Sequence, residues 1–119
     1  MDTLLRRVTG QPEGSLIAEF VGDDGQVVLQ IEISEGTAYV DELFLRHLVM
    51  VIHDIGVPGV RFGVSRVAGR PTRVDRRLWR EITQRLDGGD TTLVDLLVVG
   101  EDSWWSASAN RVAAVSHAA

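Results

Sequence analysis

A strand, a helix and a second strand are predicted along residues 59–99, whose sequence is GVRFGVSRVAGRPTRVDRRLWREITQRLDGGDTTLVDLLVV. The first strand spans residues 59–66, and an almost continuous apolar run makes residues 91–99 the second. A helix is expected over residues 73–86 with Thr72 as its N-cap, because a threonine hydroxyl can accept a hydrogen bond from a free N–H group of the first turn. Strands that flank a helix in this way indicate a sheet with a helix packed on it.

The helix over residues 73–86 is amphipathic. Apolar side chains recur at helical spacing and form the expected buried arc, which consists of Val74, Leu78, Trp79, Ile82 and Leu86. The opposite side of the helix carries four arginines, which are Arg73, Arg76, Arg77 and Arg80. Two arginines of the preceding loop, Arg66 and Arg70, can enlarge this basic surface. Guanidinium groups bind carboxylates and phosphates well, so this face is a candidate binding surface. The alternative is a solvated face with ion pairs to the acidic remainder of the chain.

The net charge of −5 conceals an asymmetry along the chain. Residues 61–85 hold eight of the 12 arginines and two acids, which gives +6, whereas the other residues hold four arginines and 15 acids, which gives −11. Such asymmetry is a hint about binding partners. Nonspecific DNA binding depends on the number of phosphates that a protein neutralises, so the overall negative charge makes a nucleic acid a less favoured partner than a protein.

A hairpin and a second helix are predicted before this region. Residues 15–21 and 26–34 have the alternating polarity of strands, and Asp23-Asp24-Gly25 supplies the turn between them. Residues 40–55 have strong helical periodicity, and Gly56 is placed to end the helix. Most of the surface of this helix is apolar, so we expect other parts of the protein to cover it on more than one side.

Two adjacent tryptophans, Trp104 and Trp105, lie in a last short strand predicted over residues 103–108. Neighbouring side chains on a strand point to opposite faces of a sheet. One indole is therefore expected in the core. The other is a candidate hydrophobic anchor for a partner, and the alternative is that both rings are covered by the terminal segments.

The predicted order of elements is β-β-α-β-α-β-β, which indicates a single α+β domain over residues 15–109 with a mixed sheet and a helix on each face. Residues 1–14 are expected to form a loose N-terminal lead-in or an edge element. Residues 110–119 are expected to form a short helix or a frayed C-terminal tail.

No motif for catalysis, cofactor binding or metal binding is recognised. The chain has no cysteine, which excludes disulfides and thiolate ligands and fits a reducing cytoplasm. His47 and His53 are six residues apart on the predicted helix, whereas a helical metal pair needs a spacing of about three or four. Serines lack both the flanking glycines of a nucleophile elbow and a placed histidine partner. We expect a cytoplasmic protein without a membrane span or signal peptide.

Several short motifs occur in a recognisable order. They are the hairpin sequence at residues 20–28, Ser34-Glu35-Gly36-Thr37, Gly69-x-Pro71-Thr72, and LVDLLVVG at residues 93–100. Their order and spacing resemble those of the RadC-type JAB/MPN domain, in which the last three motifs are S-x-G-T, G-D-P-T and L-L-D-H-L-I-V-G. The similarity covers about residues 16–106 and implies a JAB/MPN-like fold.

The same resemblance implies that the family's metal ligands are replaced. Catalytic members bind zinc through His-x-His and a following Ser-x-x-Asp, and the zinc activates water for amide hydrolysis. The corresponding positions here are Val64 and Arg66, then Val74 and Arg77, and Asp75 lies two residues short of the family's aspartate. The resemblance therefore implies the fold without its chemistry.

Inactive MPN members commonly pair with other subunits, so the resemblance implies a non-catalytic, metal-free role as a protein-interaction or dimerisation module. The residues expected to contact the partner are Arg66, Arg70, Arg73, Arg77 and Arg80, with Trp104 or Trp105 as an anchor. The alternatives are a hydrolase with an unrecognised site and a nucleic-acid-binding module that uses the arginine-rich helix.

Overall fold

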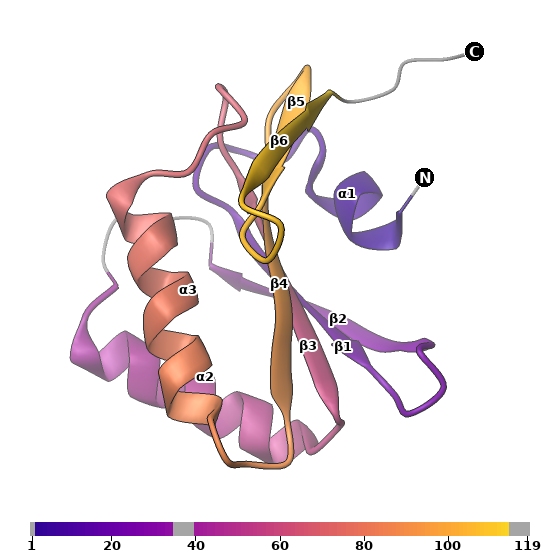
Figure 1. The fold of residues 1–119 in the computed structure, drawn as a ribbon, viewed down its shortest axis with the longest axis vertical. Coiled ribbons are helices and arrows are strands. Elements are labelled where there is room, and N and C mark those ends of the chain that lie inside the picture. Colours follow the sequence, from indigo (N-terminus) through magenta and orange to yellow (C-terminus); the bar gives the residue numbers. More distant parts are fainter. Residues whose placement is uncertain (1, 35–39, 115–119) are drawn as a thin grey trace.

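The computed structural model describes residues 2–34 and 40–114, which form three helices and a six-stranded sheet (Figure 1). The elements are α1 (Thr3–Val8), β1 (Leu16–Val21), β2 (Val27–Ser34), α2 (Glu42–Ile55), β3 (Gly59–Ser65), α3 (Arg73–Leu86), β4 (Thr92–Val99), β5 (Ser103–Ser106) and β6 (Arg111–Ala114). The predicted single α+β domain with a mixed sheet is confirmed. In these described residues, no helix is long and apolar enough to cross a membrane.

The sheet has the strand order β2-β1-β3-β4-β5-β6. Only β3 and β4, among these neighbours, run parallel, and α3 connects them; every other neighbouring pair is antiparallel. A parallel pair needs such a crossover, because the chain must return to the same end of the sheet before the second strand begins. The two strands consequently end side by side, with Ser65 opposite Val99.

Helices cover both faces of the sheet, but their distribution differs from the expected one. α2 and α3 pack together on one face, where Phe20, Phe62 and Leu96 are fully buried in one cluster with side chains of both helices (Figure 1). The opposite face carries charged side chains between these apolar ones, such as Glu19 and Arg61. Because side chains alternate across a strand, only one face offers enough apolar surface for both long helices.

The N-terminal lead-in is a helix that packs on the other face of the sheet, which corrects the expectation for residues 1–14. Leu4 and Val8 of α1 are fully buried there, in a cluster with Ile17, Leu97 and Val99. The Asp2 side chain caps α1 by accepting hydrogen bonds from the N–H groups of Leu4 and Leu5. Six residues are too few for a helical pattern to stand out in the sequence.

Close packing of α1 depends on a glycine in β3. A Cβ atom added to Gly63 would lie 2.4 Å from Cγ2 of Val8, which is closer than real Cβ contacts allow, and 3.1 Å from Cδ1 of Leu4, which is a tight contact. Glycine at this position therefore lets the helix rest directly on the strand.

The predicted hairpin is confirmed, with Gly25 at φ +78° in its turn. Phe20 pairs with Leu29, but the next residue, Val21, pairs with Val27, so Val28 is an extra residue in β2. Val27 and Leu29 consequently point to different faces of the sheet. A bulge of this kind breaks the alternation that residues 26–34 show in sequence.

The end of the chain adds another strand, which corrects part of the expectation for residues 110–119. Residues 111–114 form β6 and pair with β5, after a turn in which Asn110 has φ +51°. The strand is defined by hydrogen bonds to β5, and a four-residue segment carries little pattern of its own. Residues 115–119, like residues 35–37 of the S-x-G-T motif, lie outside the described residues.

The predicted cover of α2 on more than one side is confirmed in part, because α2 packs against the sheet and against α3, but some of its apolar side chains are exposed. Leu45, Leu48 and Ile52 are buried against the sheet. Leu43 and Met50, however, are 61% and 54% exposed. The helix is therefore apolar on a side that no described element covers.

Candidate functional site

The orientation of α3 is set by a capping box at its N-terminus. Oγ1 of Thr72 accepts a hydrogen bond from the Asp75 N–H at 3.2 Å, and the Asp75 carboxylate accepts one from the Thr72 N–H at 2.9 Å. The predicted N-cap is thus confirmed. Leu78 and Ile82 are fully buried in the core, so the opposite side of the helix faces solvent.

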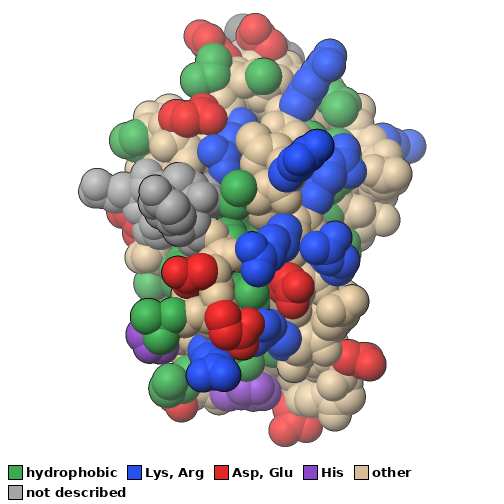
Figure 2. Space-filling view, turned by 90° about the vertical axis from the view of Figure 1, so that its left-hand side faces the viewer, with side chains coloured by type: hydrophobic (Ala, Val, Ile, Leu, Met, Phe, Trp, Pro, Cys, Tyr) green, Lys and Arg blue, Asp and Glu red, His purple; other side chains and the backbone are tan. Residues whose placement is uncertain are grey.

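That solvent-facing side and the preceding loop carry five exposed arginines with no ion pair to a carboxylate within the described residues, and four of them also lack the contact with an aromatic ring that Arg76 makes. These four are Arg70, Arg73, Arg77 and Arg80, and we call them the arginine face. Arg76 lies beside them with its guanidinium 5.1 Å from the centroid of the Trp105 ring. Figure 2 looks onto this side of the molecule, where basic side chains gather in the centre and upper right and acidic ones are interspersed lower down.

The loop that carries Arg70 is held against the turn that follows β4. The Arg66 N–H donates to the Val99 carbonyl at 3.0 Å, and the Gly69 N–H donates to the Arg66 carbonyl at 2.8 Å. Gly69 has φ +64°, and a Cβ atom on it would lie 2.5 Å from the Ser103 carbonyl oxygen. Glycine permits both the conformation and the close approach, which fixes Arg70 relative to the sheet.

Arg66 was predicted as a binding residue, but the structure gives it an internal role. Its Nε and Nη2 atoms donate to the two Asp75 carboxylate oxygens at 3.1 and 2.8 Å, and its Nη1 atom lies 3.5 Å from a Glu13 carboxylate oxygen. Asp75 is fully buried, and the Arg66 side chain is only 13% exposed. Burial would lower the pKa of the Arg66 guanidinium, but the Asp75 carboxylate holds it above its ordinary value. Arg66 therefore joins the end of β3 to the first turn of α3.

The two tryptophans point to opposite faces of the sheet, as predicted. Trp105 is 5% exposed and belongs to the main core, beneath Arg76. Trp104 is half-buried on the α1 side, where it packs against the cluster that contains Leu97 and lines a cavity of about 360 Å³. Neither ring belongs to the arginine face, so the predicted set of site residues does not form one surface.

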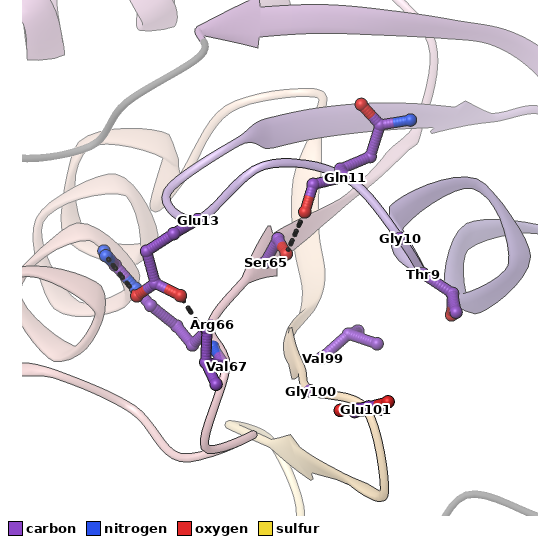
Figure 3. A pocket seen from close by; sticks show the side chains of 10 residues that line it. All are labelled: Thr9, Gly10, Gln11, Glu13, Ser65, Arg66, Val67, Val99, Gly100 and Glu101. Carbon is purple, nitrogen blue, oxygen red and sulfur yellow. Dashed lines mark hydrogen bonds and ion pairs between the residues drawn. The ribbon is translucent and has the colours of Figure 1, made fainter.

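A separate cavity of about 430 Å³ opens at the ends of β3 and β4 (Figure 3). Its walls are the carboxyl ends of the parallel strands and the segment between α1 and β1; the lining residues are Thr9, Gly10, Gln11, Glu13, Ser65, Arg66, Val67, Val99, Gly100 and Glu101. Ligands of α/β sheets commonly bind at this kind of edge.

Much of the polar lining of that cavity is used within the protein. Ser65 Oγ donates to the Gln11 carbonyl at 2.9 Å, and the Glu13 carboxylate accepts from the Val67 N–H at 2.6 Å (Figure 3). Glu101 adds an exposed carboxylate to the rim. Across the described residues, no group of three or more His, Cys, Asp or Glu side chains is placed to hold a metal ion.

The positions that correspond to zinc ligands in the resembled family have three different environments. Val64 is fully buried in the main core, and Val74, at the position of the family's serine, packs against the same core. Arg66 donates hydrogen bonds to Asp75. This contact was not predicted from the sequence. Arg77 is exposed on α3. Of these positions, Arg66 and Arg77 are cations, which repel a metal ion.

A buried polar cluster under α1 escaped prediction. Glu19 of β1 is fully buried and accepts hydrogen bonds from Thr3 Oγ1 at 2.6 Å, from Gln30 Nε2 at 2.7 Å and from the Arg61 guanidinium. Arg61 also donates to both Asp2 carboxylate oxygens at 2.9 Å. The partners come from segments up to 59 residues apart, so no local spacing could have revealed them. The cluster fastens α1 to the sheet.

Comparison with known proteins adds no relative to this description. No family model matches the chain, and no curated protein matches it.

Proposed function

We propose that this protein is a non-catalytic, metal-free interaction module that binds an acidic protein partner through the arginine face. The distribution of ion pairs carries the proposal. Of the arginines in residues 61–85, Arg61, Arg66 and Arg85 are neutralised by carboxylates of the chain itself. The arginine face has no such partner among the described residues and is held on a capped helix and an anchored loop.

Charge complementarity explains why such a face favours an acidic partner. Like charges on neighbouring positions of a helix repel one another, and a partner that carries carboxylates removes that repulsion when it binds. Guanidinium groups also form bidentate hydrogen bonds with carboxylates, which adds orientation to the attraction. The face therefore suits recognition better than it suits the stability of the isolated domain.

We also propose that the chain is a degenerate RadC-type JAB/MPN domain located in the cytoplasm. The ordered motifs support this relationship, although Val64, Arg66 and Arg77, at the positions of the family's zinc ligands, have different environments. The end of β3 contacts the first turn of α3. Arg66 and Asp75 form an ion pair at that contact. Because the Arg66 guanidinium occupies the Asp75 carboxylate, this carboxylate is not available as a metal ligand. This supports a binding role over metal-dependent hydrolysis.

Binding of a labelled poly-glutamate peptide, measured by fluorescence anisotropy at low and moderate salt, tests the proposal. We expect the double variant Arg73→Gln/Arg77→Gln to weaken binding by roughly tenfold or more, because interfacial charge pairs are worth on the order of 1 kcal/mol or more each. Arg6→Gln/Arg7→Gln removes the same charge from exposed positions of α1 on the other face and should change little.

Three results would overturn the proposal. They are equal weakening by both double variants, stoichiometric zinc that survives dialysis in the purified protein, and tighter binding of a single-stranded oligonucleotide than of the peptide at the same salt. Light scattering of the protein alone shows whether a second copy acts as the partner.

A further inference from the structure

An exposed apolar strip runs along α2. Leu43, Met50 and Val51 are 61%, 54% and 36% exposed, and we call them the α2 strip. Leu43 and Met50 are seven residues apart, which is about two helical turns, so they lie on one side of the helix. Val51 projects about 100° away from Met50 and lies at the edge of that side. This strip is the part of the apolar circumference of α2 that the sheet does not bury.

The α2 strip and the arginine face belong to the same side of the molecule. α2 and α3 pack on one face of the sheet with their buried sides toward it, so their outer sides face the same solvent (Figure 1). Arg85 in the last turn of α3 donates to both Glu42 carboxylate oxygens at 3.1 and 2.6 Å, and Glu42 directly precedes Leu43. In Figure 2, hydrophobic side chains lie at the lower left, next to the region of mixed charge.

We propose that the acidic partner is an amphipathic helix, whose apolar residues cover the α2 strip while its carboxylates meet the arginine face. The inference rests on the proposed function and adds the shape and apolar content of the partner. An amphipathic helix presents apolar residues along one side over several turns, and Leu43 and Met50 offer apolar contacts about two helical turns apart. Burying large apolar side chains supplies binding free energy that charge pairs alone do not.

A second copy of the chain fits this surface less well than an acidic partner. In a two-fold symmetric dimer the same patch meets itself, so arginines near the symmetry axis would face arginines. A nucleic acid would match the arginines but leave the α2 strip without an apolar contact. Only a partner that is both acidic and apolar satisfies the whole surface.

Two designed peptides of about 18 residues, roughly five helical turns, provide the test. One has leucines along a single helical side and glutamates elsewhere, and the other has the same composition in an order that scatters the leucines. We expect the amphipathic peptide to bind wild-type protein roughly tenfold more tightly, because well-buried apolar anchors are worth about 1 kcal/mol or more each.

Variants assign the difference to the α2 strip. Leu43→Gln/Met50→Gln keeps good helix formers at both positions and should remove the preference for the amphipathic peptide without changing binding of the scrambled one. Val28→Thr, at a 59% exposed position of β2, is the matched control and should leave the preference intact. Circular dichroism and urea unfolding of each variant confirm that it is folded.

Each remaining outcome overturns a defined part of the argument. Equal binding of both peptides, with no effect of Leu43→Gln/Met50→Gln, overturns the amphipathic partner and leaves the acidic partner intact. If neither acidic peptide binds the wild-type protein more tightly than an uncharged peptide does, both proposals are overturned. Self-association of the wild-type protein that Leu43→Gln/Met50→Gln abolishes shows that a second copy covers the strip, and it overturns the inference.

Discussion

Replacing Arg66 separates an arginine that holds the fold from the arginines proposed to bind a partner. In the variant Arg66→Met, the fully buried Asp75 loses the donors at 3.1 and 2.8 Å and keeps only the Thr72 N–H at 2.9 Å. Removing one member of a buried ion pair costs about 3–5 kcal/mol, because the other charge stays buried without compensation. The Arg66 side chain is 13% exposed, so water reaches the vacated space and the lower end, about 3 kcal/mol, is expected.

Urea unfolding followed by circular dichroism measures this loss. With an unfolding slope of roughly 1–3 kcal/mol per molar urea, the transition midpoint should fall by about 1–3 M. Arg77→Met, at an exposed position of the same helix, should change the free energy of unfolding by no more than about 0.5 kcal/mol.

A double variant tests the cause of the loss. Arg66→Met/Asp75→Asn retains a side-chain oxygen that can accept from the Thr72 N–H and removes the buried charge. It should therefore be more stable than Arg66→Met alone, because a neutral pair avoids an uncompensated carboxylate. The reasoning fails if Arg66→Met is as stable as Arg77→Met, or if the effects of the two substitutions simply add.

Two further predictions concern the docking of α1. Although burial alone would raise the pKa of Asp2, hydrogen bonds from Arg61 and from the α1 backbone hold it below its ordinary value of 3.8. The stability that Asp2 contributes is therefore complete above 3.8 and disappears as the pH falls through the lower folded-state pKa. The stability difference between wild type and Asp2→Asn, from urea unfolding at about pH 5 and at successively lower pH, should shrink in that range; a constant difference would contradict the Arg61 contact. Gly63→Ala places a Cβ atom 2.4 Å from Val8 Cγ2, so it should cost about 1–3 kcal/mol and speed amide hydrogen exchange in α1. An unchanged exchange rate there would show that α1 does not rest on β3.

Much of the architecture follows from local patterns in the sequence. The Thr72 cap, the hairpin at Gly25 and the glycine after α2 are each specified by one residue whose backbone or side-chain chemistry suits one local conformation. The exposed positions of Arg73, Arg77 and Arg80 follow from helical spacing, because Leu78 and Ile82 must be buried and these arginines lie opposite them. By contrast, α1 and β6 are too short to carry a periodic signal, and β6 is defined by its pairing with β5.

Local sequence patterns predict the hairpin, α2, β3, α3, β4 and β5, the charged side of α3, and the opposite directions of Trp104 and Trp105. These properties depend on periods of a few residues along one chain segment. Which of these charges are free depends on contacts between segments that are distant in sequence. Arg66 and Arg77 look equivalent in sequence, yet Arg66 is buried against Asp75 and Arg77 is exposed. The tertiary structure also placed α2 and α3 on one face of the sheet, and thereby the α2 strip beside the arginine face. The physical reason is that electrostatic partners and helix cover are set by distances through space between segments far apart in sequence, which local patterns do not encode.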